Sequence, residues 1–196
     1  MNVLFVCTGN LCRSPMAEAL FKLIVRSRRY DDEIHVRSAG TWASKGSPAT
    51  PDAVDVLAAV GVDLAAHRSR PLRRAHIEWA DLVVAMTSVH SLEIQEKVPD
   101  AASKIVLLKE VLEMETEPAS PTTPSAERLE AFLRAKRPRW RRALDLDDPM
   151  GLPRTAYIRC LKEIWDGVER LADAISPRTD GDELSEEIEG EAEASA

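Results

Sequence analysis

The sequence predicts an α/β fold, in which a four-stranded parallel sheet has helices on both faces. Short apolar runs typical of buried strands occur at residues 3–6, 82–86 and 105–108, and residues 34–37 alternate like a shorter strand. Stretches with apolar residues at helical spacing lie between these runs. Strands that alternate with helices form parallel sheets covered on both faces, and ligands bind beyond the carboxyl ends of such strands.

A helix is predicted after each of the first three strands in chain order. The first helix has an apolar face formed by Met16, Leu20, Leu23 and Ile24. After the strand at 34–37, Thr50 and Pro51 are typical of a helix start, as N-cap and first helical residue. We expect this second helix to end at Gly61 and to bury a face formed by Ala53, Val54, Leu57 and Ala58. The third helix is expected at about 88–98.

The second half of the chain is less regular. Residues 110–124 are acidic, contain three prolines and are predicted to form a loop that leads into a helix from Ser125. A basic cluster follows, made up of Arg134, Lys136, Arg137, Arg139, Arg141 and Arg142. We interpret this cluster as a solvated face, with attraction of phosphorylated substrates as the alternative. Pro153 is predicted to open a long helix whose apolar face is formed by Tyr157, Leu161, Ile164, Trp165, Val168, Leu171 and Ile175.

Charge is unevenly distributed along the 196 residues. The net charge is −7, but eight acidic and no basic residues lie in 180–196, so the rest of the chain carries a net charge of +1. Few apolar residues occur in this segment. We therefore expect one domain over residues 1–176, with an insertion at about 110–146, and an acidic disordered tail over 177–196.

The sequence predicts neither a signal peptide nor a membrane span, because no apolar run is long enough for either. The three cysteines, Cys7, Cys12 and Cys160, cannot all pair within the chain. A reducing compartment suits a reactive thiol. We expect a cytoplasmic monomer that has neither a membrane nor nucleic acid as a partner.

The motif Cys-Thr-Gly-Asn-Leu-Cys-Arg-Ser at residues 7–14 lies between the first strand and the first helix. In such a loop, backbone N–H groups converge on one point at a helix N-terminus, and this arrangement binds anions, typically phosphate. Cys7 stands at the start of the loop and Arg13 at its far end. A nucleophile and a cation are thereby directed at the same anion.

The individual residues of the loop suit this chemistry. A helix N-terminus, inward-pointing amides and the guanidinium of Arg13 all favour the thiolate form of Cys7, and Ser14 can add a hydrogen bond to the sulfur. Arg13 offers a planar fork that matches two phosphate oxygens. Gly9 is expected to adopt a backbone angle that other residues resist, and Asn10 to occupy the left-handed region.

The motif at the N-terminus resembles that of the low-molecular-weight protein tyrosine phosphatases. Further segments resemble landmarks of this family, in family order: residues 38–41, residues 61–71 with His67-Arg68-Ser69-Arg70, residues 80–86, and Asp148-Pro149. The resemblance covers residues 1 to about 108 and 148 to about 175. Residues 110–146 are longer than the family usually allows, and the acidic tail is an addition.

The resemblance implies a phosphomonoesterase that needs no metal or other cofactor and acts on a phosphorylated protein. Cys7 would attack phosphorus, Arg13 and the loop amides would stabilise the transition state, and Asp148 would protonate the leaving oxygen. Binding of the substrate phosphate would fall to the other loop residues, Thr8, Gly9, Asn10, Leu11, Cys12 and Ser14. Trp42 would form a pocket wall, with an ordinary surface or core position as the alternative.

Several residues have competing interpretations. Asp145 and Asp147 are alternatives to Asp148 as the general acid, although the acid of the family immediately precedes a proline, as Asp148 does. Cys12 either packs in the loop or, as the resemblance implies, forms a reversible disulfide with Cys7. Cys160 is interpreted as a core residue, and His67 as a hydrogen-bonded structural histidine outside the catalytic set.

Three rivals to a phosphotyrosine phosphatase remain open. The protein arginine phosphatases are a branch of the same family, and they are marked by a threonine at the position of Leu11. Leu11 is apolar and would pack against an aryl ring, which favours phosphotyrosine over phosphoarginine. Met150 weakens that preference for tyrosine, because the family commonly has an aromatic residue after the Asp-Pro pair. A thioredoxin-coupled arsenate reductase needs a further cysteine pair, and only Cys160 lies in the second half. The last rival is a catalytically silent phosphate-binding module.

Overall fold

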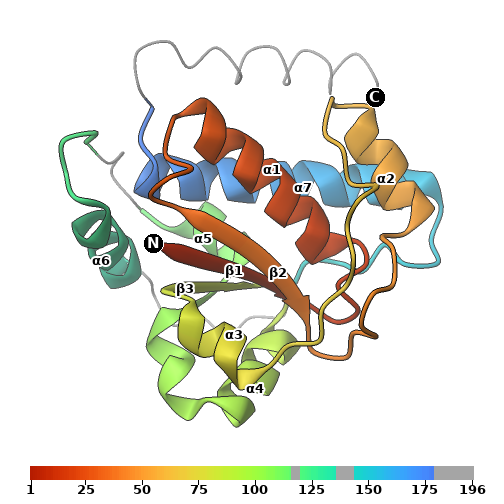
Figure 1. Cartoon of the computed structure of the whole chain (residues 1–196), viewed down its shortest axis with the longest axis horizontal. Helices are drawn as coiled ribbons and strands as arrows, with labels where there is room; N and C mark the ends of the chain where they lie inside the picture. Colours follow the sequence, from red (N-terminus) through yellow and green to blue (C-terminus); the bar gives the residue numbers. More distant parts are fainter. Residues whose placement is uncertain (116–119, 136–143, 179–196) are drawn as a thin grey trace.

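Four parallel strands form the centre of the molecule. The computed structural model describes residues 1–115, 120–135 and 144–178. The strands are β1 (Asn2–Cys7), β2 (His35–Gly40), β3 (Leu82–Ala85) and β4 (Ile105–Leu107), in the order β2-β1-β3-β4. All three pairings are parallel, so all four carboxyl ends lie at one edge of the sheet (Figure 1). The predicted fold class is confirmed.

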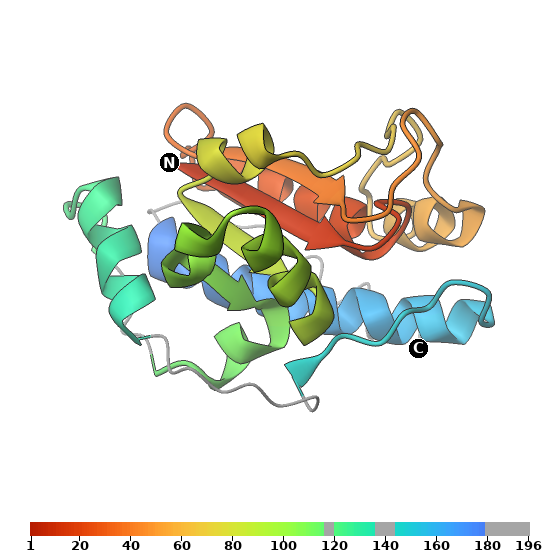
Figure 2. The same cartoon turned by 90° about the horizontal axis from the view of Figure 1, so that it is seen from below.

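Helices cover both faces of the sheet. One face shares a core with α1 (Arg13–Ser27), α2 (Pro51–Ala58), α5 (Leu108–Glu113), α6 (Ser125–Ala135) and the long α7 (Arg154–Ile175), in which α2 and α6 pack against α7. The other face packs against α3 (Arg74–Trp79), α4 (Ser88–Lys97) and the 3-10 helix η1 (Pro99–Lys104). In Figure 2, α3 and α4 lie in front of the sheet and α7 lies behind it.

Alternation along β1 divides the core into two layers. Val3, Phe5 and Cys7 pack towards α1 and α7, whereas Leu4 and Val6 pack towards α3 and α4. All five are buried, because side chains of a central strand alternate between two covered faces. The ring of Phe5 meets Phe21 of α1 edge to face, with the ring centroids 5.6 Å apart. This packing fixes α1, and with it the loop that precedes α1.

Helix α2 begins as predicted but buries a slightly different face. The Thr50 hydroxyl caps it by accepting a hydrogen bond from the backbone N–H of Ala53, and Gly61 follows it with a φ of +75°. The prediction that Ala58 is buried is wrong, since this residue is exposed and Val56 is buried in its place. Positions 53, 56, 57 and 60 follow the i, i+3, i+4, i+7 spacing of one helical face, and Ala58 lies outside it.

The predicted loop over 110–124 is wrong at its start, because α5 extends to Glu113. The buried Glu110 side chain accepts a hydrogen bond from the backbone N–H of Leu107 and so caps this short helix. Helix α3 and η1 were also not predicted from the pattern. Helix α3 buries one side chain, Ile77, so that no periodic signal exists along it.

Helix α6 begins at Ser125, as predicted, and contacts the C-terminal end of α7. Buried Arg128 donates hydrogen bonds to the backbone carbonyls of Ile175 and Thr123 and lies over the ring of Tyr30.

Of the basic cluster, Arg134 lies in α6 and pairs with Glu130, and residues 136–142 are outside the described residues. The expected disorder of the acidic tail likewise falls on residues 179–196, outside the described part. No helix within the described residues is long and apolar enough to span a membrane.

Candidate active site

The loop that joins β1 to α1 lies at the carboxyl edge of the sheet. Strand β1 ends at Cys7 and α1 begins at Arg13, with Cys12 in the N-cap position. The Cys7 side chain is buried at the base of the loop, where the backbone N–H of Asn10 donates to its Sγ over 3.3 Å. Ser14 Oγ lies 2.9 Å from the same sulfur. The expected hydrogen bond between Ser14 and Cys7 is confirmed, and the thiol is held by two polar partners.

Asn10 ties the loop to the rest of the site. Its φ is +54°, so the expected left-handed backbone is confirmed. Its buried side chain donates to the hydroxyls of Ser14 (3.0 Å) and Ser38 (2.8 Å) and accepts from the backbone N–H of Arg70 (2.9 Å). A buried amide with all these partners holds one conformation of the loop.

His67 has the structural role that was predicted for it. Its Nε2 lies 2.9 Å from the backbone carbonyl oxygen of Asn10. Burial lowers the pKa of His67 below its usual value, which favours the neutral ring. The ring therefore supports the left-handed turn of the loop without adding charge to it.

The loop requires glycine at position 40, whereas Gly9 does not have the positive φ expected for it. The expectation for Gly9 is wrong, because the glycines with positive φ in the described residues are Gly46, Gly61 and Gly151. Gly40, at the end of β2, is the position where a side chain is excluded. A Cβ there would lie 2.4 Å from the Thr8 carbonyl oxygen and 2.9 Å from the Asn10 nitrogen. Close packing of β2 against the loop therefore requires glycine at position 40.

Arg13 is buried beneath the loop, and its guanidinium is held at several atoms. Nη1 donates to the carbonyl of Leu146 (3.0 Å), and Nη2 pairs with the Asp148 carboxylate and lies 3.5 Å from the Thr8 hydroxyl. Its Nε is buried and has no hydrogen-bond partner among the described residues. A buried cationic N–H of this kind matches an anion oxygen, because an unsatisfied donor is costly to bury.

The three candidate carboxylates occupy different positions. Asp148 accepts from Arg13, from the thiol of Cys12 (3.8 Å) and from the backbone N–H of Met150 (3.2 Å). Asp145 points away and caps α4, accepting from the backbone N–H (2.6 Å) and the hydroxyl (3.1 Å) of Ser88. Asp147 is exposed. Of the three, Asp148 is the carboxylate that contacts the Cys7 loop.

The two remaining thiols are protonated at neutral pH. Burial, together with neighbouring Cys7 and Asp148, raises the pKa of Cys12 to about 12. Burial also raises the pKa of Cys160, whose Sγ lies 4.0 Å from the carbonyl oxygen of Asp147. Cys160 is buried against the core, as predicted. Cys7 and Cys12 are both free thiols in this structure, so the two interpretations of Cys12 stay open.

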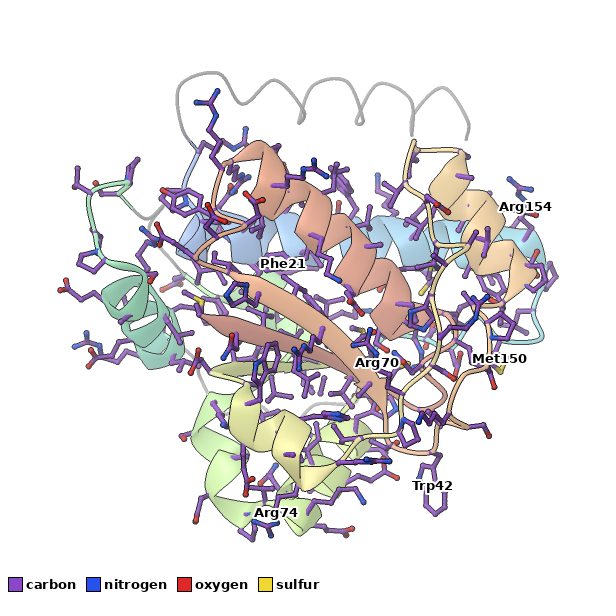
Figure 3. All side chains as sticks on the ribbon, viewed as in Figure 1. Phe21, Trp42, Arg70, Arg74, Met150 and Arg154 are labelled. Carbon is purple, nitrogen blue, oxygen red and sulfur yellow. The ribbon has the colours of Figure 1, made fainter. Side chains whose placement is uncertain are left out.

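Exposed apolar side chains lie beside the loop. The backbone N–H of Trp42 donates to the Thr8 carbonyl (3.0 Å), and its indole N–H donates to Glu93 of α4 (2.7 Å), while the residue is 77% exposed. Leu11 is half-buried and Met150 is 46% exposed. Figure 3 places Trp42 and Met150 at the end of the molecule towards which the strands run. The pocket-wall interpretation of Trp42 stays a prediction.

His90 was not identified from the sequence as part of this site. This buried residue lies in the first turn of α4, and its Nε2 is 2.8 Å from the Thr8 hydroxyl. The available signal was Thr87, a typical N-cap residue two positions after the end of β3, which places the start of α4 at the same sheet edge as the loop. Within the described residues, His, Cys, Asp and Glu side chains form no cluster suited to a metal ion.

The site therefore combines a thiol that a loop N–H contacts, a buried cation and a carboxylate. The family model described as "Low molecular weight phosphotyrosine protein phosphatase" matches residues 2–133. A protein-arginine-phosphatase of Geobacillus stearothermophilus is 46% identical over 109 residues, which are 56% of this chain and 70% of that relative. A probable low molecular weight protein-tyrosine-phosphatase, EpsP of Ralstonia solanacearum, is 37% identical over 110 residues, 56% of this chain and 72% of the relative.

The fold is also found among solved structures. One is the YwlE arginine phosphatase, as a C7S mutant with a phosphorylated active site serine. Its sequence is 34% identical to this chain, and the two structures superpose with a TM-score of 0.68 over 88% of this chain and 93% of the YwlE chain. The similarity therefore extends over both the loop and the surrounding sheet and helices.

Proposed function

Since this chain belongs to the low molecular weight phosphotyrosine protein phosphatase family, we propose that it hydrolyses phosphotyrosine-type phosphomonoesters of proteins through a thiophosphate–enzyme intermediate. The family match confirms the resemblance of the N-terminal loop, and the family consists of hydrolases that act on phosphoesters. One observation carries the proposal for the site: the buried Arg13 guanidinium pairs with Asp148 directly beside the loop that holds the Cys7 sulfur.

In the first step, the Cys7 thiolate attacks phosphorus in line with the leaving oxygen. A sulfur–phosphorus bond forms and the phosphorus–oxygen bond to the substrate breaks, while Asp148 as the acid gives its proton to the leaving oxygen. The loop N–H groups and the Arg13 guanidinium stabilise the equatorial oxygens. The contacts of Ser14 and Asn10 with the Cys7 sulfur support its role as the nucleophile, because they hold the sulfur at the base of the loop.

In the second step, water releases the phosphate. The Asp148 carboxylate takes a proton from water, the water oxygen bonds to phosphorus, and the sulfur–phosphorus bond breaks to restore the thiolate. In the YwlE arginine phosphatase structure, an active-site serine carries the phosphoryl group, which supports covalent transfer to a side chain at such a loop.

A protein arginine phosphatase is the second candidate, because a relative of that name is 46% identical to this chain, whereas EpsP, named as a probable protein-tyrosine-phosphatase, is 37% identical. Half-buried Leu11 argues for tyrosine, since an apolar side chain packs on an aryl ring but leaves a guanidinium partly unpaired. The test is hydrolysis of an aryl phosphate, phosphotyrosine and phosphoarginine side by side, with Cys7→Ser as the control. Loss of all three activities in Cys7→Ser supports a shared nucleophile.

We expect phosphotyrosine to exceed phosphoarginine in kcat/KM, with a relatively high KM. Met150 keeps sulfur–aromatic contact with a ring but lacks stacking, at a cost of about 1 kcal/mol. Leu11→Thr should narrow the preference, because its hydroxyl can bond a guanidinium and its side chain is smaller. Faster hydrolysis of phosphoarginine by the wild-type protein would overturn the substrate assignment and leave Cys7, Arg13 and Asp148 in their proposed roles.

We also propose that the catalytic unit is the segment 1–176 and that it is a cytoplasmic monomer with neither nucleic acid nor a membrane as partner. Removing residues 179–196 is expected to leave turnover of an aryl phosphate unchanged. The cut retains Arg178, whose guanidinium pairs with Glu169 and Asp173 of α7. All residues assigned to the site precede it. Steady-state kinetics and a thermal melt check this, and a large fall in kcat or a lost unfolding transition would contradict it.

A further inference from the structure

The imidazole of His90 lies between two hydroxyl groups, one of which belongs to the phosphate-binding loop. Its Nε2 is 2.8 Å from Thr8 Oγ1, and its Nδ1 is 2.8 Å from Thr87 Oγ1. The residue is 3% exposed, so the ring makes these contacts away from bulk solvent. A buried chain of hydrogen bonds therefore runs from the N-cap of α4 into the loop that starts at Cys7.

The protonation state of the ring fixes the direction of this chain. Burial and, next, the positive charge of Arg13 lower the pKa of His90 to about 4, against smaller opposing effects of Glu93, Asp148 and Asp145. The ring is therefore neutral at physiological pH. A neutral imidazole has one N–H donor and one acceptor nitrogen, so it must donate to one hydroxyl and accept from the other.

The partners of the two hydroxyls select one of the two directions. Thr87 Oγ1 accepts the backbone N–H of His90 as the helix cap, and among the described residues Nδ1 is the acceptor within reach of its own proton. A proton on Nδ1 would leave the Thr87 hydroxyl without an acceptor there, whereas a proton on Nε2 leaves the free hydroxyl proton on Thr8, beside Arg13. Nε2–H then donates to Thr8 Oγ1, which also receives Arg13 Nη2 at 3.5 Å. Both acceptor sites of the Thr8 oxygen are filled in this way, and its proton is free to donate to an anion bound beside Arg13.

We propose that His90, as the Nε2–H tautomer, is a positioning residue that turns the Thr8 hydroxyl into a donor for the substrate phosphate. His90 itself touches neither the nucleophile nor the reacting atoms. The role rests on the proposed phosphatase function. It also explains a buried histidine next to a cation, because a neutral donor adds no charge to repel Arg13.

The first test measures inorganic phosphate binding and turnover of an aryl phosphate in His90→Ala, His90→Gln and Thr8→Val. We expect His90→Ala to weaken phosphate binding and to lower kcat/KM by roughly 10-fold, the order expected for losing one hydrogen bond to a charged group. His90→Gln should recover most of both, because its side-chain amide can donate to Thr8. In the double variant His90→Ala/Thr8→Val, the loss should not exceed that of the worse single variant.

His76→Ala is the matched control. The ring of this α3 histidine accepts a hydrogen bond from the backbone N–H of Arg73 at 3.3 Å and has no hydrogen bond to the loop. Phosphate binding and turnover should be unchanged in it. Additive losses from His90→Ala and Thr8→Val, or losses in His90→Gln as large as in His90→Ala, would overturn the proposal.

The second test uses ring nitrogen-15 NMR of the wild-type protein and therefore does not depend on folding of a variant. His90 is expected to stay neutral, with its proton on Nε2, down to about pH 5, well below the range in which an ordinary histidine titrates. A proton on Nδ1, or titration of His90 near its ordinary pKa, would overturn the assignment. If the wild-type protein hydrolyses no phosphoester, the phosphatase proposal fails, whereas phosphate binding and the NMR spectrum still decide the role of His90.

Discussion

Cys7→Ser is expected to abolish turnover on every substrate while the protein stays folded and binds phosphate. A serine hydroxyl does not ionise near neutral pH as a thiol does, so the nucleophile is lost. The loss should be on the order of 10⁴-fold or more, as for removal of other catalytic nucleophiles. The loop should persist, since the side chain of Asn10 and the ring of His67 hold it through contacts that do not involve the sulfur. Steady-state kinetics, equilibrium binding of inorganic phosphate and a thermal melt measure the three properties.

Cys160→Ser makes the same chemical change at another buried cysteine and serves as the control. Cys160 lies in α7, outside the loop, and its sulfur contacts the carbonyl of Asp147, which a hydroxyl can also do. This variant should retain turnover. Undiminished turnover in Cys7→Ser would refute the covalent mechanism, and equal loss in both variants would indicate damage to the fold instead of loss of a nucleophile.

Asp148→Asn is expected to lower kcat by roughly 10²- to 10⁴-fold for substrates with poor leaving groups, the range typical of general acids. An asparagine cannot protonate the leaving oxygen, so the group must depart as an anion. Activated aryl phosphates need little protonation and should be affected much less. The measurement is kcat across a series of phosphate monoesters with increasingly basic leaving groups, in which the variant should show the steeper decline.

Stability should change little in Asp148→Asn. The Asp148 side chain is 44% exposed, so solvent screens its ion pair with buried Arg13, and the side-chain oxygen of asparagine can still accept a hydrogen bond from the guanidinium. A small shift of the melting temperature with a large kinetic defect is therefore the expected combination. Asp147→Asn, at the exposed neighbouring carboxylate, is the matched control and should behave as wild type. If Asp147→Asn shows the leaving-group dependence and Asp148→Asn does not, the acid is misassigned.

The sequence alone determined the strands, most of the helices and the local geometry of the loop. Val3 to Val6 read as a buried strand because every residue is apolar, and both faces of β1 are indeed covered. Thr50 and Pro51 marked the start of α2 because capping depends on residues within one turn. The left-handed Asn10 and the contact between Ser14 and Cys7 were predictable because all three residues lie within eight positions.

Short-range patterns failed where capping or weak periodicity decided the structure. Acidic composition and nearby prolines predicted a loop from residue 110, but the Glu110 side chain caps the short helix α5, which ends at Glu113. Helix α3 has one buried side chain and gives no periodic signal. The buried face of α2 was misassigned at Ala58 because adjacent small apolar residues do not distinguish neighbouring helical faces.

Tertiary structure alone decided which distant residues meet the loop. Asp145, Asp147 and Asp148 are near neighbours in sequence, and packing of their segment against the sheet edge directs Asp148 to Arg13 and Asp145 to the start of α4. Gly40 and His90 both lie next to Thr8, although Gly40 ends β2 and His90 lies in α4, which follows β3. The physical reason is that four parallel strands bring their carboxyl ends to one edge, and only the strand order β2-β1-β3-β4 determines which following segments lie beside the loop of β1.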